Sequence, residues 1–250
     1  MLIEQVCAPP ASRRQHPKGP AMFASQTAPL HERGAAIYSR AVLCIYDMLV
    51  VRVSNSWIWR SPSQQTLKVY AQHLSADHLE IGPGTGWYLA HADLPKQMQL
   101  RLMDLNENSL ELTARRVLAT SQLTPDKIQQ IHGNILAEDQ PLSEQVASIG
   151  ANYLLHCLPG DPVVRHKALS NMAAMLADDG VLFGSTILGD DAGHNLAGRG
   201  LMKLYNHLSI FDNCDDDQAS LHGLLEGLFH HVEMSRSGAV VTFIASYPRR

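Results

Sequence analysis

The sequence predicts an α/β fold, a seven-stranded and mostly parallel sheet with helices on both faces and an antiparallel hairpin at its end. Through the middle of the 250-residue chain, short apolar runs alternate with helical patterns, which requires crossover connections between parallel strands. A glycine-rich turn follows the first apolar run, a pattern typical of a strand that leads into a ligand-binding loop. The last two apolar runs are separated by only two or three residues, which fits a hairpin.

Each predicted element follows from its local pattern. Seven apolar runs are the expected strands, at 77–81, 99–104, 129–132, 146–153, 180–186, 232–236 and 239–246. Apolar residues at helical spacing predict helices at about 86–92, 107–120, 162–177 and 218–229, with a turn around 141–144.

The chain divides into three regions. Residues 1–33 are rich in Pro, Ala, Gln and Arg without an apolar period, so we expect a flexible lead-in. Residues 34–76 are expected to form a helical cap, whose last helix begins after a capping Ser63. Residues 77–250 form the main domain. Its insert 189–217 is longer than a compact sheet needs, which is typical of a functional lid.

The overall composition restricts the partners. A formal net charge of −4 gives no general attraction to nucleic acid or to an anionic membrane. The four cysteines are widely separated without C-x-x-C spacing, which indicates free thiols in a reducing compartment. No apolar run reaches membrane-spanning length, and the N-terminus lacks a secretion-signal pattern. We therefore expect a cytoplasmic protein without nucleic-acid or membrane partners.

The turn after the first strand is the most informative motif. Its glycines, within residues 82–86, allow positive φ angles and close approach of a ligand. Glu80 lies in a strand whose faces should both be buried, where an unpaired charge costs several kcal/mol, roughly, and a cationic ligand would supply the partner. Trp87 stands where a dinucleotide-binding fingerprint has its third glycine. An ordinary strand-to-helix loop is the alternative interpretation.

The pattern E-x-G-x-G-x-G resembles the first motif of class I S-adenosylmethionine-dependent methyltransferases of the small-molecule type. The resemblance covers about residues 35–250, with motifs at 79–86, 104, 133–135, 151–160 and 179–190. It implies a Rossmann-like sheet whose final strand is inserted antiparallel. It also implies S-adenosyl-L-methionine (SAM) as the cofactor and S-adenosyl-L-homocysteine as the product.

Further cofactor contacts are expected where later strands end. Asp104 ends the second strand beside the first loop, where a carboxylate can accept two hydrogen bonds from a ribose diol; helix capping is the alternative. Asn134 stands where the family often has an acid for the adenine amino group, although it is also a common turn residue. The expected cofactor residues are Glu80, Gly82, Pro83, Gly84, Thr85, Gly86, Asp104, Leu105, Asn134, Ile135 and Asn152.

Two histidines are candidate general bases, because the unperturbed pKa of histidine lies near neutrality. They are His156 and His194, and a structural role is the alternative for His156. Cys157 would act as a nucleophile only beside an activating base. No His or Cys pair has the spacing of metal ligands, so no metal is expected. The expected acceptor-binding residues, from the cap and the insert, are Tyr38, Tyr46, Trp59, Tyr205, Asn206 and Phe211.

Methyl transfer from SAM to a small-molecule acceptor, a metabolite or natural product, is the function predicted from these features. A non-catalytic SAM-binding partner subunit is one alternative. A nicotinamide-dependent oxidoreductase is another, which Trp87 and the terminal hairpin disfavour. An aminopropyltransferase would show several acids along the fourth strand, and residues 152–155 contain none.

Overall fold

The computed structural model describes residues 56–139, 142, 144–189 and 192–250. The predicted lead-in and most of the predicted cap, with Tyr38 and Tyr46, lie outside the described residues, as do parts of the predicted turn around 141–144. Within the described ranges, no helix is both long and apolar enough to cross a membrane.

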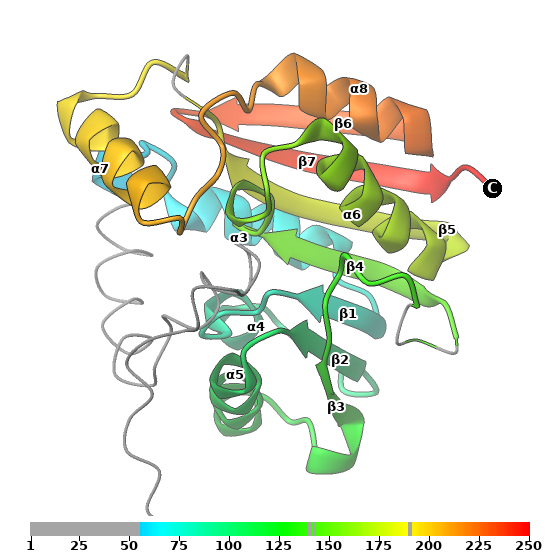
Figure 1. Cartoon of the computed structure of the whole chain (residues 1–250). Helices are drawn as coiled ribbons and strands as arrows, with labels where there is room; N and C mark the ends of the chain where they lie inside the picture. The colour runs from blue at the N-terminus through cyan, green and yellow to red at the C-terminus, as the bar shows by residue number, and fades with distance from the viewer. Residues whose placement is uncertain (1–55, 140–141, 143, 190–191) are drawn as a thin grey trace, which may run out of the picture.

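A seven-stranded sheet runs through the molecule in the order β3-β2-β1-β4-β5-β7-β6 (Figure 1). Strands β1 to β5 pair in parallel. β7 lies between β5 and β6 and runs antiparallel to both, which confirms the predicted fold class. The strands are β1 (Asp77–Ile81), β2 (Gln99–Asp104), β3 (Ile128–His132), β4 (Val146–Asn152), β5 (Leu176–Ile187), β6 (Phe229–Ser237) and β7 (Val240–Pro248).

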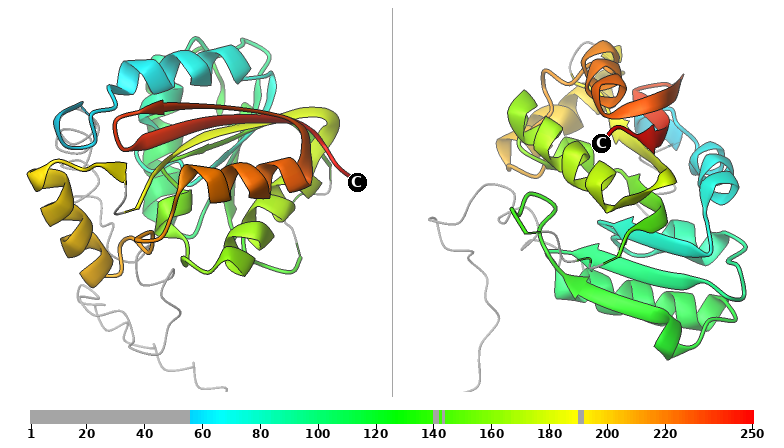
Figure 2. Two further views of the ribbon diagram at one scale, coloured as in Figure 1. Left: turned by 90° about the horizontal axis from the view of Figure 1, so that it is seen from above. Right: turned by 90° about the vertical axis from the view of Figure 1, so that its right-hand side faces the viewer.

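Helices cover both faces of this sheet (Figure 2). On one face, α3 (Ser63–His73), α4 (Trp87–His91) and α5 (Glu107–Thr120) share a core with β2 through residues such as Tyr70, Leu102 and Leu110. On the other face, α6 (Pro162–Met175) and α8 (Gln218–Leu228) pack on the sheet through Leu169 and Leu225. Short 3-10 helices lie at η2 (Pro125–Lys127) and η3 (Leu155–Cys157).

Four of the six α-helices in the described ranges start with a side-chain cap, and α3 and α4 do not. The side chains of Asn106, Asp161 and Asp217 accept backbone N–H groups at the starts of α5, α6 and α8. The prediction that Ser63 caps α3 is wrong, because α3 begins at Ser63 and Pro62 precedes it without a side-chain cap. A proline there leaves the orphan N–H groups of the first turn to other partners.

Strand β5 begins earlier than its apolar pattern indicates. The predicted helix to residue 177 ends at Met175, and Leu176 already pairs with Val146 of β4. The register then shifts between Val146 and Ser148. The shift accommodates the polar run 177–180, which is not apolar enough to read as a strand.

The insert 189–217 contains a helix that the sequence analysis did not predict, α7 (Leu196–His207). Asn195 caps its first turn, and Met202 is buried in the core. The insert is tied to the segment before α3, since Arg60 Nη2 donates to the Gly193 carbonyl at 2.7 Å and Asn195 Nδ2 to that of Trp57 at 3.0 Å. Asn213 Nδ2 also donates to the Ile187 carbonyl, which places the insert beside the carboxyl end of β5.

Candidate active site

The glycine turn opens at its centre and is packed at its two ends. Gly82, Gly84 and Gly86 have φ angles of 64°, 58° and 72°, values that side-chain-bearing residues rarely adopt. A Cβ on Gly84 would meet no atom within 4 Å, whereas one on Gly86 would lie 2.8 Å from Thr113 Cγ2. Packing of the turn against α5 therefore leaves an unobstructed cradle at Gly84.

Asp104 lies beside this cradle, at the carboxyl end of β2. Ser109 Oγ donates to Asp104 Oδ2 at 2.7 Å and contacts the Gly84 carbonyl at 2.8 Å, so one hydroxyl joins the acid to the turn. The Asn106 N–H donates to Asp104 Oδ1 at 2.9 Å, at the start of α5. Burial raises the pKa of Asp104, an effect that these two hydrogen bonds oppose. The acid thus orders the helix start and is also placed for a ribose contact.

Glu80 is buried as expected, but the protein itself supplies its partners. Tyr70 donates its hydroxyl to Glu80 Oε2 at 2.7 Å, and His78 Nε2 lies 3.0 Å from the same oxygen. His78 Nδ1 continues the network to Ser148 Oγ at 2.8 Å. The expectation that Glu80 needs a cationic ligand as its partner is therefore wrong. Its contact with a cofactor stays a prediction.

Asn152 Nδ2, at the end of β4, is buried without a hydrogen-bond partner within the described residues. The hydroxyls of Tyr153, Tyr88 and Thr66 are also buried and interact with one another. Burial raises the pKa of Tyr153 to about 12 and that of Tyr88 well above 10, so both hydroxyls stay protonated. A buried polar group without a partner costs about 1–3 kcal/mol. The unmet donor of Asn152 fits a polar ligand at the carboxyl end of β4.

The polar groups of the loop after β3 are mostly hydrogen-bonded within the protein. Asn134 Oδ1 accepts the Leu136 N–H at 2.9 Å, the geometry of a turn asparagine. Ile135 is buried in the core, and its carbonyl accepts from Asn171 Nδ2 at 2.6 Å. Asn134 therefore serves as a turn residue, which was the alternative interpretation. The predicted adenine contacts of Asn134 and Ile135 and the predicted cofactor contact of Leu105 stay predictions.

His156, a predicted general base, is buried, and its surroundings oppose the uptake of a proton. Burial and the nearby charge of Arg165 lower its pKa to about 3. The Ile187 N–H donates to Nδ1 at 3.4 Å, so the ring's proton lies on Nε2. A nitrogen of such low pKa is a poor proton acceptor near pH 7. The geometry makes His156 a donor or a structural residue.

Cys157 is similarly inert. Burial raises the pKa of its thiol to about 12, so the reactive thiolate does not form near neutral pH. Its Sγ is directed toward the Tyr153 carbonyl at 3.9 Å.

His194 has the same tautomer as His156, but its acceptor nitrogen has no partner within the described residues. Nε2 lies 3.1 Å from the Leu188 carbonyl and 2.8 Å from the Gly189 carbonyl. Because carbonyls only accept, Nε2 carries the proton of the neutral ring. Nδ1 is buried without a partner among the described residues, beside Gly198, and so presents a lone pair.

Aromatic rings from three parts of the chain meet at Phe211. Its ring centroid lies 4.4 Å from His156, 4.9 Å from Tyr205 and 6.4 Å from Trp59. Trp59 in turn lies edge-on to His194 at 5.5 Å. Five predicted site residues therefore form one cluster beyond the ends of β4 and β5. We call it the Phe211 cluster: Trp59, His156, His194, Tyr205 and Phe211.

Asn206 does not share this arrangement. Its Nδ2 donates to the Met202 carbonyl and to Asn213 Oδ1, and its Oδ1 accepts the Asn213 N–H. These hydrogen bonds of the Asn206 amide close the loop after α7. Asn206 therefore has no free N–H group with which to contact the methyl acceptor.

Several residues of the site were missed by sequence reasoning. Tyr70 and His78 hold Glu80, Ser109 joins Asp104 to the turn, and Tyr88 packs against Tyr153. Only His78 carried a signal, since it stands two residues before Glu80 and shares its face of the strand. The others come from helices whose register on the sheet is not readable from local pattern.

Comparison with known proteins shows that this chain is similar to methyltransferases. A methyltransferase domain model matches residues 79–182. YbcY of Escherichia coli (strain K12) is 40% identical over 197 residues, covering 78% of this chain and 97% of that protein. The physcion biosynthesis cluster O-methyltransferase of Aspergillus chevalieri is 31% identical over 223 residues, covering 87% and 96%.

The fold is also that of a solved enzyme with SAM bound. Human N-acetylserotonin methyltransferase in complex with SAM superimposes with a TM-score of 0.61 at 16% identity. The match covers 89% of this chain and 61% of the human chain. At this identity the likeness concerns the fold.

Proposed function

Because this chain belongs to the class I SAM-dependent methyltransferases, we propose that it methylates a hydroxyl group of a small aromatic molecule. The observation that carries the proposal is the open cradle at Gly84 with the Asp104 carboxylate beside it and a cluster of aromatic rings beyond. The O-methyltransferase name of the fungal relative supports oxygen as the acceptor atom.

The residues at the carboxyl edge fit SAM. Gly84 offers open backbone, Asp104 offers carboxylate lone pairs for the ribose hydroxyls, and Asn152 Nδ2 offers an unmet donor to the methionine part. SAM supplies a methyl group already activated by its sulfonium. The work left to the protein is to align the acceptor with that methyl and to exclude water, an effect of up to about 7–11 kcal/mol on the barrier.

The Phe211 cluster supplies the acceptor side. The buried rings of Trp59 and His156 each lie within ring-contact distance of Phe211, an arrangement that suits a flat apolar molecule. A weakly acidic hydroxyl would still need a proton acceptor as it attacks. We assign that role to His194 Nδ1, the unpartnered acceptor at the edge of the cluster.

The proposal is tested by incubating the full chain with SAM and a panel of phenols, enols, aromatic amines and aliphatic alcohols, and measuring S-adenosylhomocysteine by mass spectrometry. We expect turnover with aromatic hydroxyl compounds and none with the amines or aliphatic alcohols. Turnover with amines alone would contradict an oxygen acceptor. Folded protein that gave no calorimetric heat with SAM or S-adenosylhomocysteine would overturn the whole proposal, and oxidation of reduced nicotinamides would favour the oxidoreductase alternative.

Replacing His194 with glutamine is expected to lower kcat by about 100-fold, since general-base catalysis contributes about 10²–10⁴-fold. The glutamine amide can still donate to the Leu188 and Gly189 carbonyls, so the loop keeps its anchor. The SAM dissociation constant should change less than twofold. The control is His207→Gln, an exposed residue at the end of α7. A kcat within twofold of the wild type in His194→Gln would remove His194 from the chemistry.

A further inference from the structure

Arg165 is a buried cation in the first turn of α6. Its side chain is only 8% exposed. Nε donates to the Pro159 carbonyl at 3.0 Å, Nη1 to the Leu155 carbonyl, and Nη2 to the Asp212 carbonyl at 2.8 Å. Nη2 also forms an ion pair with Asp216 Oδ2 at 2.9 Å. A planar guanidinium is suited to such a set, because its donors have a fixed fork geometry.

These contacts join two loops that each carry a ring of the Phe211 cluster. We call residues 153–161, between β4 and α6, the His156 loop, and residues 208–217, between α7 and α8, the Phe211 loop. The loops also bond directly, since the Asp212 N–H donates to the His156 carbonyl at 3.0 Å and the Gly160 N–H to Asp212 Oδ2 at 2.9 Å. Among the described residues, the Arg165 side chain donates to both loops at once.

We propose that Arg165, held by Asp216, is a positioning residue for the methyl transfer: it fixes the His156 loop against the Phe211 loop and so sets the distance between the two rings that face the acceptor. This inference rests on the proposed function for the identity of the acceptor side. A displacement of about 1 Å at a reacting centre costs about 100-fold in rate, so a loosened loop pair lowers turnover without touching the cofactor.

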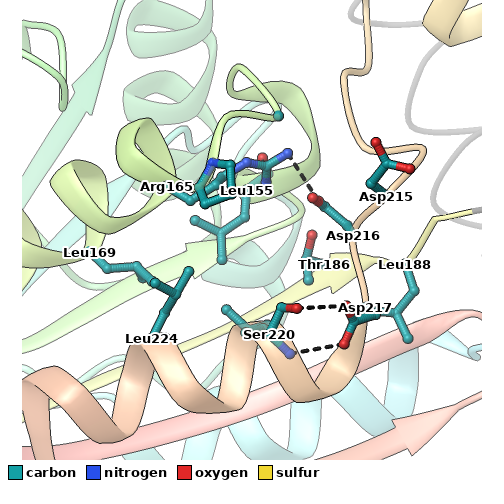
Figure 3. A pocket seen from close by; sticks show the side chains of 13 residues that line it. Leu155, Arg165, Leu169, Thr186, Leu188, Asp215, Asp216, Asp217, Ser220 and Leu224 are labelled. Carbon is teal, nitrogen blue, oxygen red and sulfur yellow. Dashed lines mark hydrogen bonds and ion pairs between the residues drawn. The ribbon is translucent and has the colours of Figure 1, made fainter.

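The ion pair lies beside a pocket of about 210 Å³ on the α6 and α8 face (Figure 3). Leucines from α6 and α8 form much of its wall, with Asp215, Asp216 and Asp217 along one side. Figure 3 shows Arg165 and Asp216 directed toward each other across this space, with Thr186 behind them. The pocket brings solvent close to Asp216, so its carboxyl can exchange protons in the folded protein.

Burial raises the pKa of Asp216 to about 6, against the opposing charge of Arg165 and with further raising effects from Asp212 and Asp217. Below about pH 6 the carboxyl takes up a proton and the ion pair with Arg165 is lost. Because this pKa lies above that of an ordinary Asp, the folded state binds the proton more tightly than the unfolded state. The stabilisation from this group is therefore complete below about pH 4 and disappears as the pH rises through about 6. Acidification to pH 5 thus weakens the hold of Arg165 on the two loops, and protonation of Asp216 does not itself unfold the protein.

The test compares Arg165→Lys, Asp216→Asn and the control Arg115→Lys, an exposed partner of Glu111 on α5. Hydrogen–deuterium exchange on the ligand-free protein should be at least threefold faster in both loops of Arg165→Lys and unchanged in the control. With an acceptor from the panel, kcat/KM for the acceptor should fall about 10–100-fold, since lysine keeps the charge but not the fork, while the SAM dissociation constant stays within twofold.

The pH profile separates positioning from general destabilisation. In the wild type, kcat/KM for the acceptor should fall as the pH drops through about 6, and Asp216→Asn should show a lower value without that fall. Unchanged exchange in Arg165→Lys, or a persisting fall in Asp216→Asn, would overturn the inference. If the wild type methylates no acceptor, the proposed function fails while the exchange data still decide whether Arg165 fixes the two loops.

Discussion

Replacing Glu80 with alanine is expected to lower the free energy of unfolding by about 2–6 kcal/mol, because each of two buried polar groups left without an acceptor costs about 1–3 kcal/mol. The side chain is buried between β1 and α3, where Tyr70 and His78 share one of its oxygens. Its loss leaves a buried hydroxyl and a buried ring nitrogen without their acceptor. Urea unfolding followed by circular dichroism measures the change.

The matched control is Glu111→Ala, which removes a carboxylate from an exposed pair with Arg115 one helical turn away. That pair is worth about 0.3–0.5 kcal/mol. Glu80→Gln keeps one oxygen as an acceptor, so its loss in the free energy of unfolding should lie between those of Glu80→Ala and Glu111→Ala. A loss of less than about 1 kcal/mol in Glu80→Ala would mean that the Tyr70 and His78 groups find other partners and that the network does not hold α3 on the sheet.

Replacing Asp104 with alanine is expected to weaken SAM binding by at least about 100-fold. Two hydrogen bonds from the ribose hydroxyls to a carboxylate would be lost, each worth about 1.5–3 kcal/mol. The Ser109 hydroxyl also loses one of its two acceptors but keeps the Gly84 carbonyl, so the glycine turn stays attached to α5. Isothermal titration calorimetry with SAM and with S-adenosylhomocysteine measures the loss.

Asp77→Ala serves as the control, since Asp77 begins β1 at the opposite edge of the sheet and pairs with Arg101. Its SAM affinity should stay within twofold of the wild type. Protonation of Asp104 should act like the alanine substitution. Because burial raises the pKa of this carboxyl, SAM binding should weaken at a higher pH than an ordinary Asp would cause. Full affinity in Asp104→Ala would place the ribose elsewhere.

Much of the fold was predictable because its signals are local. A buried parallel strand is a short apolar run, and every predicted strand has a counterpart in the structure. The helix α7 was missed because Gly198 and Gly200 lower the helix propensity of its first half. Packing of Met202 in the core and the Asn195 cap compensate for them, and neither contribution is visible in a local window.

The candidate site also contains residues that local pattern revealed and contacts that it could not reveal. The glycine turn and Asp104 were found from the sequence because both follow a strand end directly, and parallel strands present their carboxyl ends at one edge. Local pattern also marked Glu80 as a buried acid. Its partner was misjudged, since which side chain of α3 meets it depends on how the helix is placed across the sheet.

The sequence by itself determined the order of the strands and of the helices other than α7, the position of the open turn and the acid beside it, since these depend on residues within a few positions of one another. Tertiary structure alone decided which groups satisfy the buried charges: Tyr70 for Glu80, and for Arg165 the carbonyl of Asp212, 47 residues away. It also decided that His156 stays neutral whereas His194 keeps a free nitrogen. The physical reason is that periodicity specifies which face of an element is buried, but hydrogen bonds and pKa shifts depend on the atoms that the fold places opposite that face.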